Sequence, residues 1–111
     1  MIFVTGGAYQ GKKDFALKYF KNYDIINNYH IIIKNLISEN INLLEYTENI
    51  ISENKDIIII MDEIGCGIVP TDREERFWRE MCGKCGCIIA EKADVVVRVT
   101  CGIGTAIKGE L

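Results

Sequence analysis

Proline, histidine and tryptophan are scarce in this sequence of 111 residues: Pro70, His30 and Trp78 are each the sole residue of their type. With one proline and no tract rich in serine, glycine and proline, the chain shows no linker between folding units. No internal repeat is visible either. We therefore expect one domain that spans residues 1–111, since this length suits a single compact unit.

Long apolar runs and an excess of basic charge are also absent. No apolar run approaches the ~20 residues that a membrane-spanning helix needs. The start of the chain lacks the basic region of a signal peptide, and its apolar run stops at Gly6. We therefore expect a cytoplasmic protein with no membrane partner. The net charge of −3 leaves no basic excess to neutralise a nucleic-acid strand, so we expect no nucleic-acid partner.

Apolar runs that suit buried strands alternate with stretches of helical periodicity. We expect strands at 2–5, 24–26, 57–61, 95–99 and 107–108, a turn at 102–104, and helices at 14–23, at 31–54 with a break near 38–40, and from 72 or 73 to 81 or 92. Thr71 and Glu74 have the spacing of a capping box for the last helix. Strands that alternate with helices predict an α/β fold with a mostly parallel sheet.

The first strand runs directly into a glycine-rich loop. The spacing Gly6-x-x-x-x-Gly11-Lys12, between a strand and a helix, is that of a phosphate-binding loop. Backbone N–H groups in such a loop point into one concavity, and the following helix adds its positive end. We therefore predict a P-loop NTPase-like three-layer fold. Its phosphate-binding residues are Gly6, Gly7, Ala8, Tyr9, Gln10, Gly11, Lys12 and Lys13. Lys13 replaces the serine or threonine whose hydroxyl would hold magnesium, and a charged lysine cannot ligate a metal.

Two acidic residues end the strongest strand, which contains four consecutive isoleucines. Asp62 and Glu63 follow Ile57–Met61, and ligands of open α/β sheets bind beyond the carboxyl ends of the strands. We expect Asp62 to hold Mg²⁺, directly or through water. Glu63 could orient or deprotonate an attacking hydroxyl. The alternative is that one of the two caps a turn or pairs with an arginine.

Basic residues near the start of the last helix offer further anion ligands. Arg73 and Arg76 are neighbours on a helix and could clamp phosphate or carboxylate. The alternative is a solvated face on which they pair with nearby glutamates.

Cysteine and histidine raise two other hypotheses. Cys82, Cys85 and Cys87 could bind a metal, although no second Cys-x-x-Cys pair completes a knuckle, and small, semi-buried thiols are the favoured interpretation. His30 could be a covalent nucleophile toward a nucleotide phosphate. It stands alone beside an asparagine-rich turn, which favours a histidine at the surface or the edge of the core.

Two segments together resemble a known enzyme family. The loop Thr5-Gly6-Gly7-Ala8-x-x-Gly11-Lys12 and the string Glu63-Ile64-Gly65-Cys66-Gly67-Ile68-Val69-Pro70-x-x-Arg73-x-x-Arg76 are similar to those of the bifunctional adenosylcobinamide kinase / adenosylcobinamide-phosphate guanylyltransferases of cobalamin biosynthesis. The similarity continues through Gly83, Ala90, Ala93-Asp94, the valine strand, Gly102-Ile103 and Lys108. It covers roughly the first twenty and the last fifty residues, and the second string is the more specific signal.

The resemblance implies ATP or GTP binding and a kinase step that phosphorylates a hydroxyl of adenosylcobinamide. By family analogy the partners are the nucleotide and a corrinoid, and the assembly is a homo-oligomer, expected as a trimer. The middle of this chain is shorter than in the family, and the stretch that carries the family's guanylylated histidine has no counterpart. We therefore do not transfer that role to His30 or predict guanylyl transfer. Asp62 stands where the family commonly has asparagine.

Three functional hypotheses result. The first is a short, divergent nucleotide-dependent kinase of the adenosylcobinamide type, in which Lys12 stabilises charge on the transferred group, Asp62 holds magnesium and Glu63 orients the acceptor. The second is a non-catalytic nucleotide-binding or assembly subunit of the same fold, which Lys13 and the short middle favour. The third is a thiol-metal protein.

Overall fold

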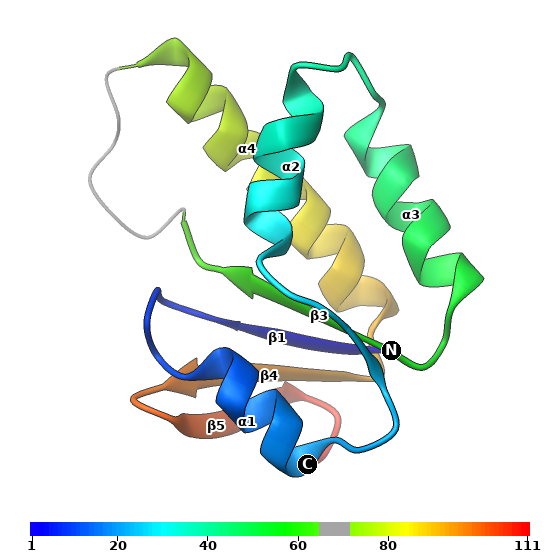
Figure 1. The fold of residues 1–111 in the computed structure, drawn as a ribbon, viewed down its shortest axis with the longest axis vertical. Helices are drawn as coiled ribbons and strands as arrows, with labels where there is room; N and C mark the ends of the chain where they lie inside the picture. The colour runs from blue at the N-terminus through cyan, green and yellow to red at the C-terminus, as the bar shows by residue number, and fades with distance from the viewer. Residues whose placement is uncertain (65–71) are drawn as a thin grey trace.

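The structure of the protein is a computed structural model that describes residues 1–64 and 72–111. Its elements alternate along the chain in the order expected (Figure 1). They are β1 (Ile2–Gly6), α1 (Lys12–Tyr19), β2 (Asp24–Ile26), α2 (Tyr29–Ile37), α3 (Leu43–Glu53), β3 (Ile57–Asp62), α4 (Arg73–Lys92), β4 (Val95–Thr100) and β5 (Ile103–Lys108). Among the described residues, no helix has the length and apolar character needed to cross a membrane.

The described strands form one sheet of five, in the order β2-β3-β1-β4-β5. β1 lies between β3 and β4 and is parallel to both, and β2 is parallel to β3. Among these described strands only β5 is antiparallel to its neighbour, β4. The predicted α/β fold with a mostly parallel sheet is therefore confirmed.

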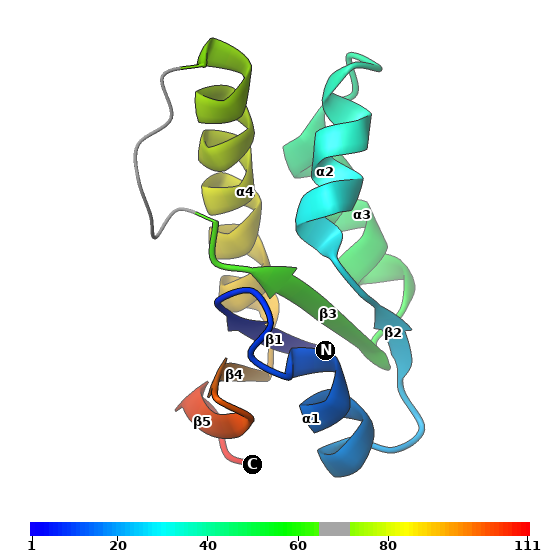
Figure 2. The same ribbon diagram turned by 60° about the vertical axis from the view of Figure 1, so that its left-hand side comes forward.

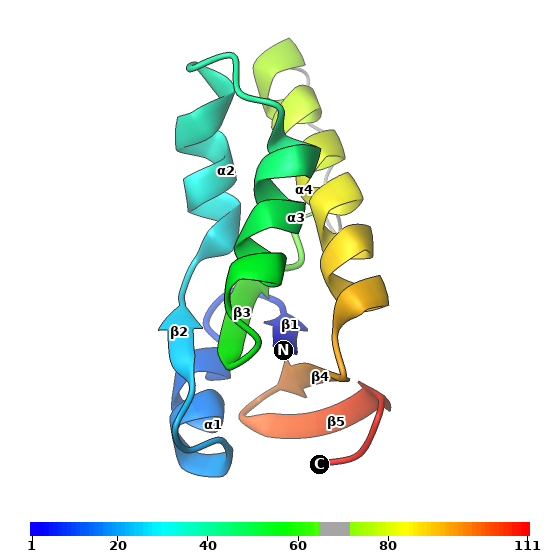
Figure 3. The ribbon, with the colours of Figure 1, turned by 90° about the vertical axis from the view of Figure 1, so that its right-hand side faces the viewer.

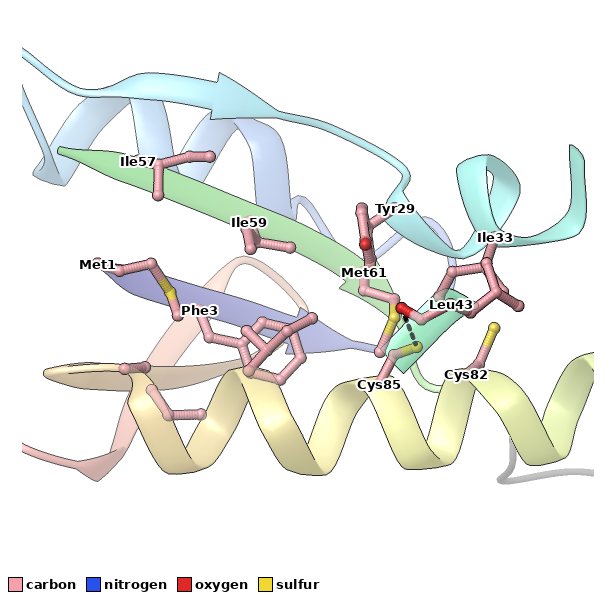
Figure 4. Close-up of a cluster of buried hydrophobic side chains, with 13 residues drawn as sticks. Met1, Phe3, Tyr29, Ile33, Leu43, Ile57, Ile59, Met61, Cys82 and Cys85 are labelled. Carbon is pink, nitrogen blue, oxygen red and sulfur yellow. Dashed lines mark hydrogen bonds between the residues drawn. The ribbon is translucent and has the colours of Figure 1, made fainter. Parts of the chain in front are cut away.

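Helices cover both faces of the sheet, as Figures 2 and 3 show. Phe15 and Ala16 of α1 pack on one face with alternate residues of β1, β3 and β4. The other face packs against α2, α3 and α4 in a second apolar cluster (Figure 4). The isoleucines of β3 are buried throughout because their side chains enter the two clusters alternately. This is the predicted three-layer, P-loop NTPase-like fold.

Several predicted boundaries differ from the structure. α1 ends at Tyr19 rather than Tyr23, because Phe20 is extended and Asn22 has a φ of 66°. The turn predicted over 102–104 is confined to Cys101 and Gly102, which both have positive φ, and β5 begins directly at Ile103.

The two helices of the middle and the last helix agree with their predicted positions. The break expected near 38–40 separates α2 from α3, and the Asn42 side chain caps α3 by accepting the Glu45 N–H. α4 runs to Lys92, and the Asp72 side chain accepts the Glu74 N–H at its start. Thr71, the predicted capping residue, lies outside the described residues.

Candidate functional site

Two glycines give the loop between β1 and α1 a backbone path that other residues would not follow easily. Gly6 has a φ of 149°, and a Cβ added there would lie 2.4 Å from the Val99 carbonyl oxygen. Gly11 has a φ of 85° and directly precedes α1. Because both conformations favour glycine, the spacing recognised in the sequence has a structural cause at each end of the loop.

The loop is tied to the turn between β4 and β5. The Gly102 N–H donates to the Gln10 carbonyl oxygen at 2.8 Å, and the Cys101 N–H donates to Gln10 Oε1 at 2.7 Å. Tyr9, beside this anchor, is fully exposed in a left-handed conformation. The turn between β4 and β5 therefore holds the loop at Gln10, while the Tyr9 side chain stays exposed to solvent.

Lys12 and Asp62 meet beneath the loop. The Lys12 side chain is buried; its Nζ donates to the Gly7 carbonyl oxygen at 2.7 Å and lies 2.6 Å from Asp62 Oδ1. Asp62 is opposite Gly6 in the pairing of β1 with β3, so the loop and the acidic residue leave adjacent strands at the same edge of the sheet. The ammonium group is thus fixed between a backbone carbonyl and a carboxylate.

His30 completes this cluster from the start of α2. Its Nδ1 accepts the Asp62 backbone N–H at 3.1 Å, and its Nε2 lies 3.3 Å from Asp62 Oδ2. The side chain is buried, and this burial lowers the pKa of His30 below its usual 6.5; Lys12 adds to the lowering and Asp62 opposes it.

The contact between His30 and Asp62 was not among the contacts expected from the sequence. A usable signal was available, because residues 27–30 follow β2, whose carboxyl end lies beside that of β3. Ligands of open α/β sheets bind beyond the carboxyl ends of the strands. This rule, which pointed to Asp62, therefore also applied to the turn after β2.

A cavity of about 490 Å³ opens above these residues. Its lining combines the loop, the turn after β2 and the end of β3: Ala8, Tyr9, Gln10, Gly11, Lys12, Lys13, Asp14, Asn27, Asn28, His30, Ile31, Ile60 and Asp62. Lys13 is exposed, unlike Lys12. The cavity therefore has backbone N–H groups, two ammonium groups and one helix N-terminus on its loop side, which suits a polyphosphate.

Glu63 points to a different neighbour. Its carboxylate accepts two hydrogen bonds from the Arg98 guanidinium, from Nε at 2.9 Å and from an Nη atom at 3.0 Å. Glu63 lines a smaller cavity of about 270 Å³ with Thr5 and Arg79, and Asp62 lines both cavities. The arginine pairing weighed for the acidic pair is thus the contact that Glu63 makes.

The arginines of α4 lie apart from the loop. Arg73 lines a separate cavity of about 510 Å³ between α4 and α2, together with Lys34 and Trp78. Lys34 Nζ lies 4.6 Å from the Trp78 ring centroid. Neither Arg73 nor Arg76 lines the cavity at the loop, so the structure does not bring them to Lys12.

Two of the three clustered cysteines are part of the core. Cys82 and Cys85 face the apolar cluster from α4, and the Cys85 thiol lies 3.9 Å from the Leu43 carbonyl oxygen (Figure 4). Burial raises the pKa of Cys82 to about 12. Cys87 is exposed, and Cys66 lies outside the described residues. Within the part of the chain that the structure describes, no three histidine, cysteine or acidic residues gather as a metal site.

Comparison with known proteins agrees with the resemblance found in the sequence. The profile of the cobinamide kinase / cobinamide phosphate guanyltransferase family matches residues 25–107, which include His30 and Asp62 but not the glycine loop. The chain is 38% identical over 52 residues to the bifunctional adenosylcobalamin biosynthesis protein CobU of Salmonella typhimurium. That alignment covers 47% of this chain and only 29% of the relative. Because the family profile matches most of the sequence, the chain belongs to the cobinamide kinase / cobinamide phosphate guanyltransferase family.

Proposed function

We propose that this chain binds ATP or GTP at the glycine loop and transfers the terminal phosphoryl group to a hydroxyl of a cobinamide. The observation that carries the proposal is the 2.6 Å contact between Lys12 and Asp62 at the base of the 490 Å³ cavity. The contact supports the proposal because phosphoryl-transfer sites combine a cation for the outer phosphates with an acid for a metal. Family membership supports the class of acceptor.

Different groups of the loop bind different parts of the nucleotide. The backbone N–H groups from Gly7 to Lys12 and the start of α1 bind phosphate oxygens. Lys12 exchanges its contact with Asp62 for the outer phosphates and there opposes the charge that grows during transfer. Lys13, exposed at the rim of the same cavity, adds a second cation.

Asp62 fits a role in magnesium binding. Mg²⁺ is usually bound by one or two carboxylates, with substrate phosphates and water completing six oxygen ligands. Asp62 offers one carboxylate at the cavity, and Lys13 offers no hydroxyl, so phosphate oxygens and water would supply the other ligands. A bound ion would offset phosphate charge during transfer.

Glu63 is our candidate for orienting the acceptor hydroxyl. Asp62 lines both cavities, so an acceptor that enters the smaller one would approach the phosphates from the side of Glu63. This role requires the Glu63 carboxylate to release Arg98. Guanylyl transfer is not part of the proposal, because both ring nitrogens of His30 already face Asp62.

A non-catalytic nucleotide-binding or assembly subunit is the second candidate. Lys13 in place of a metal-binding hydroxyl and the pairing of Glu63 with Arg98 favour it. For either function we propose a cytoplasmic protein, with a homo-oligomer, expected as a trimer, by analogy with the family. We also propose that residues 1–111 act as one nucleotide-binding domain, since the described strands share one sheet.

Nucleotide titration with and without magnesium tests the proposal. ATP and GTP binding would be followed by calorimetry, and phosphoryl transfer by incubation of labelled ATP with cobinamide. Lys12→Ala should weaken binding by about 10-fold or more, because a charge-assisted hydrogen bond contributes roughly 1.5–3 kcal/mol. Lys18→Ala, which removes the same charge from an exposed position of α1, is the matched control.

The outcomes separate the two candidates. Transfer of label to cobinamide would establish the kinase, whereas binding without transfer would leave the non-catalytic subunit. If the parent protein binds neither nucleotide, or if Lys12→Ala binds as well as Lys18→Ala, the assignment of the loop is wrong.

A further inference from the structure

We propose that His30 is a positioning residue that fixes the Asp62 carboxylate for magnesium. The inference rests on the proposed function, since it concerns how Asp62 would hold the metal of a bound nucleotide. His30 is 32 positions from Asp62 in the chain, yet both of its ring nitrogens lie against that one residue.

The first support is the backbone of β3. β2 ends at Ile26, opposite Ile59, so β3 extends beyond its neighbour before it reaches Asp62. The next amide, of Glu63, donates to Gly6 on the side of β1. The Asp62 amide therefore faces the open side, where His30 Nδ1 accepts it at 3.1 Å. His30 thus supplies the hydrogen-bond acceptor that a neighbouring strand would otherwise supply at this position.

The second support is the proton on the ring. Because Nδ1 accepts a hydrogen bond, the proton of the neutral imidazole is on Nε2, which lies 3.3 Å from Asp62 Oδ2. Lys12 faces the other oxygen, Oδ1. The two carboxylate oxygens therefore have different partners, Lys12 at Oδ1 and His30 at Oδ2.

The third support is the anchoring of His30 itself. Its carbonyl oxygen accepts the Trp78 indole N–H at 2.7 Å, which ties the start of α2 to α4. When a nucleotide draws Lys12 away, His30 still holds Oδ2, and Oδ1 is freed toward the cavity. Removal of the imidazole would let the carboxylate rotate, which weakens metal binding more than nucleotide binding.

Variants at position 30 separate the two contacts. His30→Asn keeps an acceptor near the position of Nδ1, and His30→Gln carries an amide N–H to the position of Nε2. ATP binding would be measured by calorimetry across a magnesium series for the parent, these two variants and His30→Ala. Thr47→Val, which removes a buried hydroxyl hydrogen-bonded between α2 and α3, controls for lost stability away from the site.

We expect His30→Ala and His30→Asn to need about 10-fold more magnesium for half-maximal enhancement of ATP binding, as is typical when the partner of a metal ligand is lost. Their affinity for ATP without magnesium should stay within about twofold of the parent, since the loop contacts are intact. His30→Gln and Thr47→Val should retain the magnesium requirement of the parent.

Three results would overturn the inference. One is an unchanged magnesium requirement in folded His30→Ala. Another is an equal requirement in His30→Asn and His30→Gln, which still decides the question if His30→Ala does not fold. The third is a guanylyl adduct on His30 after incubation with labelled GTP, since it would make the ring a nucleophile. By contrast, a parent protein that binds no ATP at any magnesium concentration refutes the proposed function, and this inference with it.

Discussion

The ion pair between Lys12 and Asp62 can be measured by a double-mutant cycle. Lys12→Met removes the ammonium group but keeps most of the buried stem, and Asp62→Asn keeps the shape of the carboxylate without its charge. The side chains are 7% and 21% exposed, and the atoms that meet are 2.6 Å apart. A pair this enclosed should couple far more strongly than one at the surface.

The magnitude follows from the burial and the separation. Two unit charges about 4 Å apart attract by roughly 4 kcal/mol at an effective dielectric constant of about 20. After Asp62→Asn, Lys12 still has the Gly7 carbonyl, and after Lys12→Met, Asp62 still has His30. These remaining contacts reduce the measured difference. We therefore expect a coupling energy of about 2–4 kcal/mol, within the range of close charge pairs in other proteins.

Urea unfolding, followed by the fluorescence of the sole tryptophan, Trp78, supplies the four free energies. The matched control is the exposed pair Lys84 and Glu80 on α4, 3.2 Å apart, for which a coupling of about 0.3–0.5 kcal/mol is expected. Adding salt should reduce the control coupling and leave the buried one nearly unchanged.

A coupling below about 0.5 kcal/mol would show that positions 12 and 62 act independently, because independent sites add within that margin. It would mean that water screens the two charges in solution, and that Lys12 is not held at the carboxylate before a nucleotide arrives.

Further predictions concern two glycines, the acid and the thiols. Gly6→Ala should lower the free energy of unfolding by at least about 2 kcal/mol, because its Cβ would meet a carbonyl of β4 at 2.4 Å. Gly83→Ala, in a helix with nothing within 4 Å of the new Cβ, should raise it by about 0.5–1 kcal/mol in the same urea assay. Asp62→Asn should tighten magnesium-free ATP binding by about 10-fold in calorimetry, since Lys12 no longer has a competing anion; unchanged affinity would contradict the exchange proposed for Lys12. Iodoacetamide should modify exposed Cys87 and spare Cys85, whose pKa burial raises, and peptide mapping by mass spectrometry that finds the reverse would disprove the packing of α4.

Local patterns in the sequence were sufficient to predict the fold, the glycine loop and the position of Asp62 near that loop. Four consecutive isoleucines specify a strand buried on both faces, and β3 is that strand. The spacing from Gly6 to Lys12 predicts the loop because the required backbone angles belong to residues a few positions apart. Asp62 could be placed near Lys12 because parallel strands end at the same edge of a sheet, whatever their order.

Those local patterns do not predict the directions of side chains or the order of the strands. Asp62 and Glu63 are adjacent in sequence but contact Lys12 and Arg98 respectively, since successive residues of an extended chain point to opposite sides. Arg73 shares a family motif with the acidic end of β3, yet it lines another cavity because α4 extends away from the loop. No periodicity in the sequence encodes these directions.

The α/β fold, the glycine loop and the position of an acid near that loop thus follow from local spacing and burial in the sequence, whereas the contact between Lys12 and Asp62 comes from the structure. The position of His30 in the candidate site, by contrast, depends on tertiary structure. β2 is adjacent to β3 and ends before it, which leaves the Asp62 amide without a strand partner and brings the start of α2 beside it. That juxtaposition depends on the order of the strands and the length of β2. The turn after β2 pointed to this edge of the sheet, but the contact between His30 and Asp62 could not be read from the sequence.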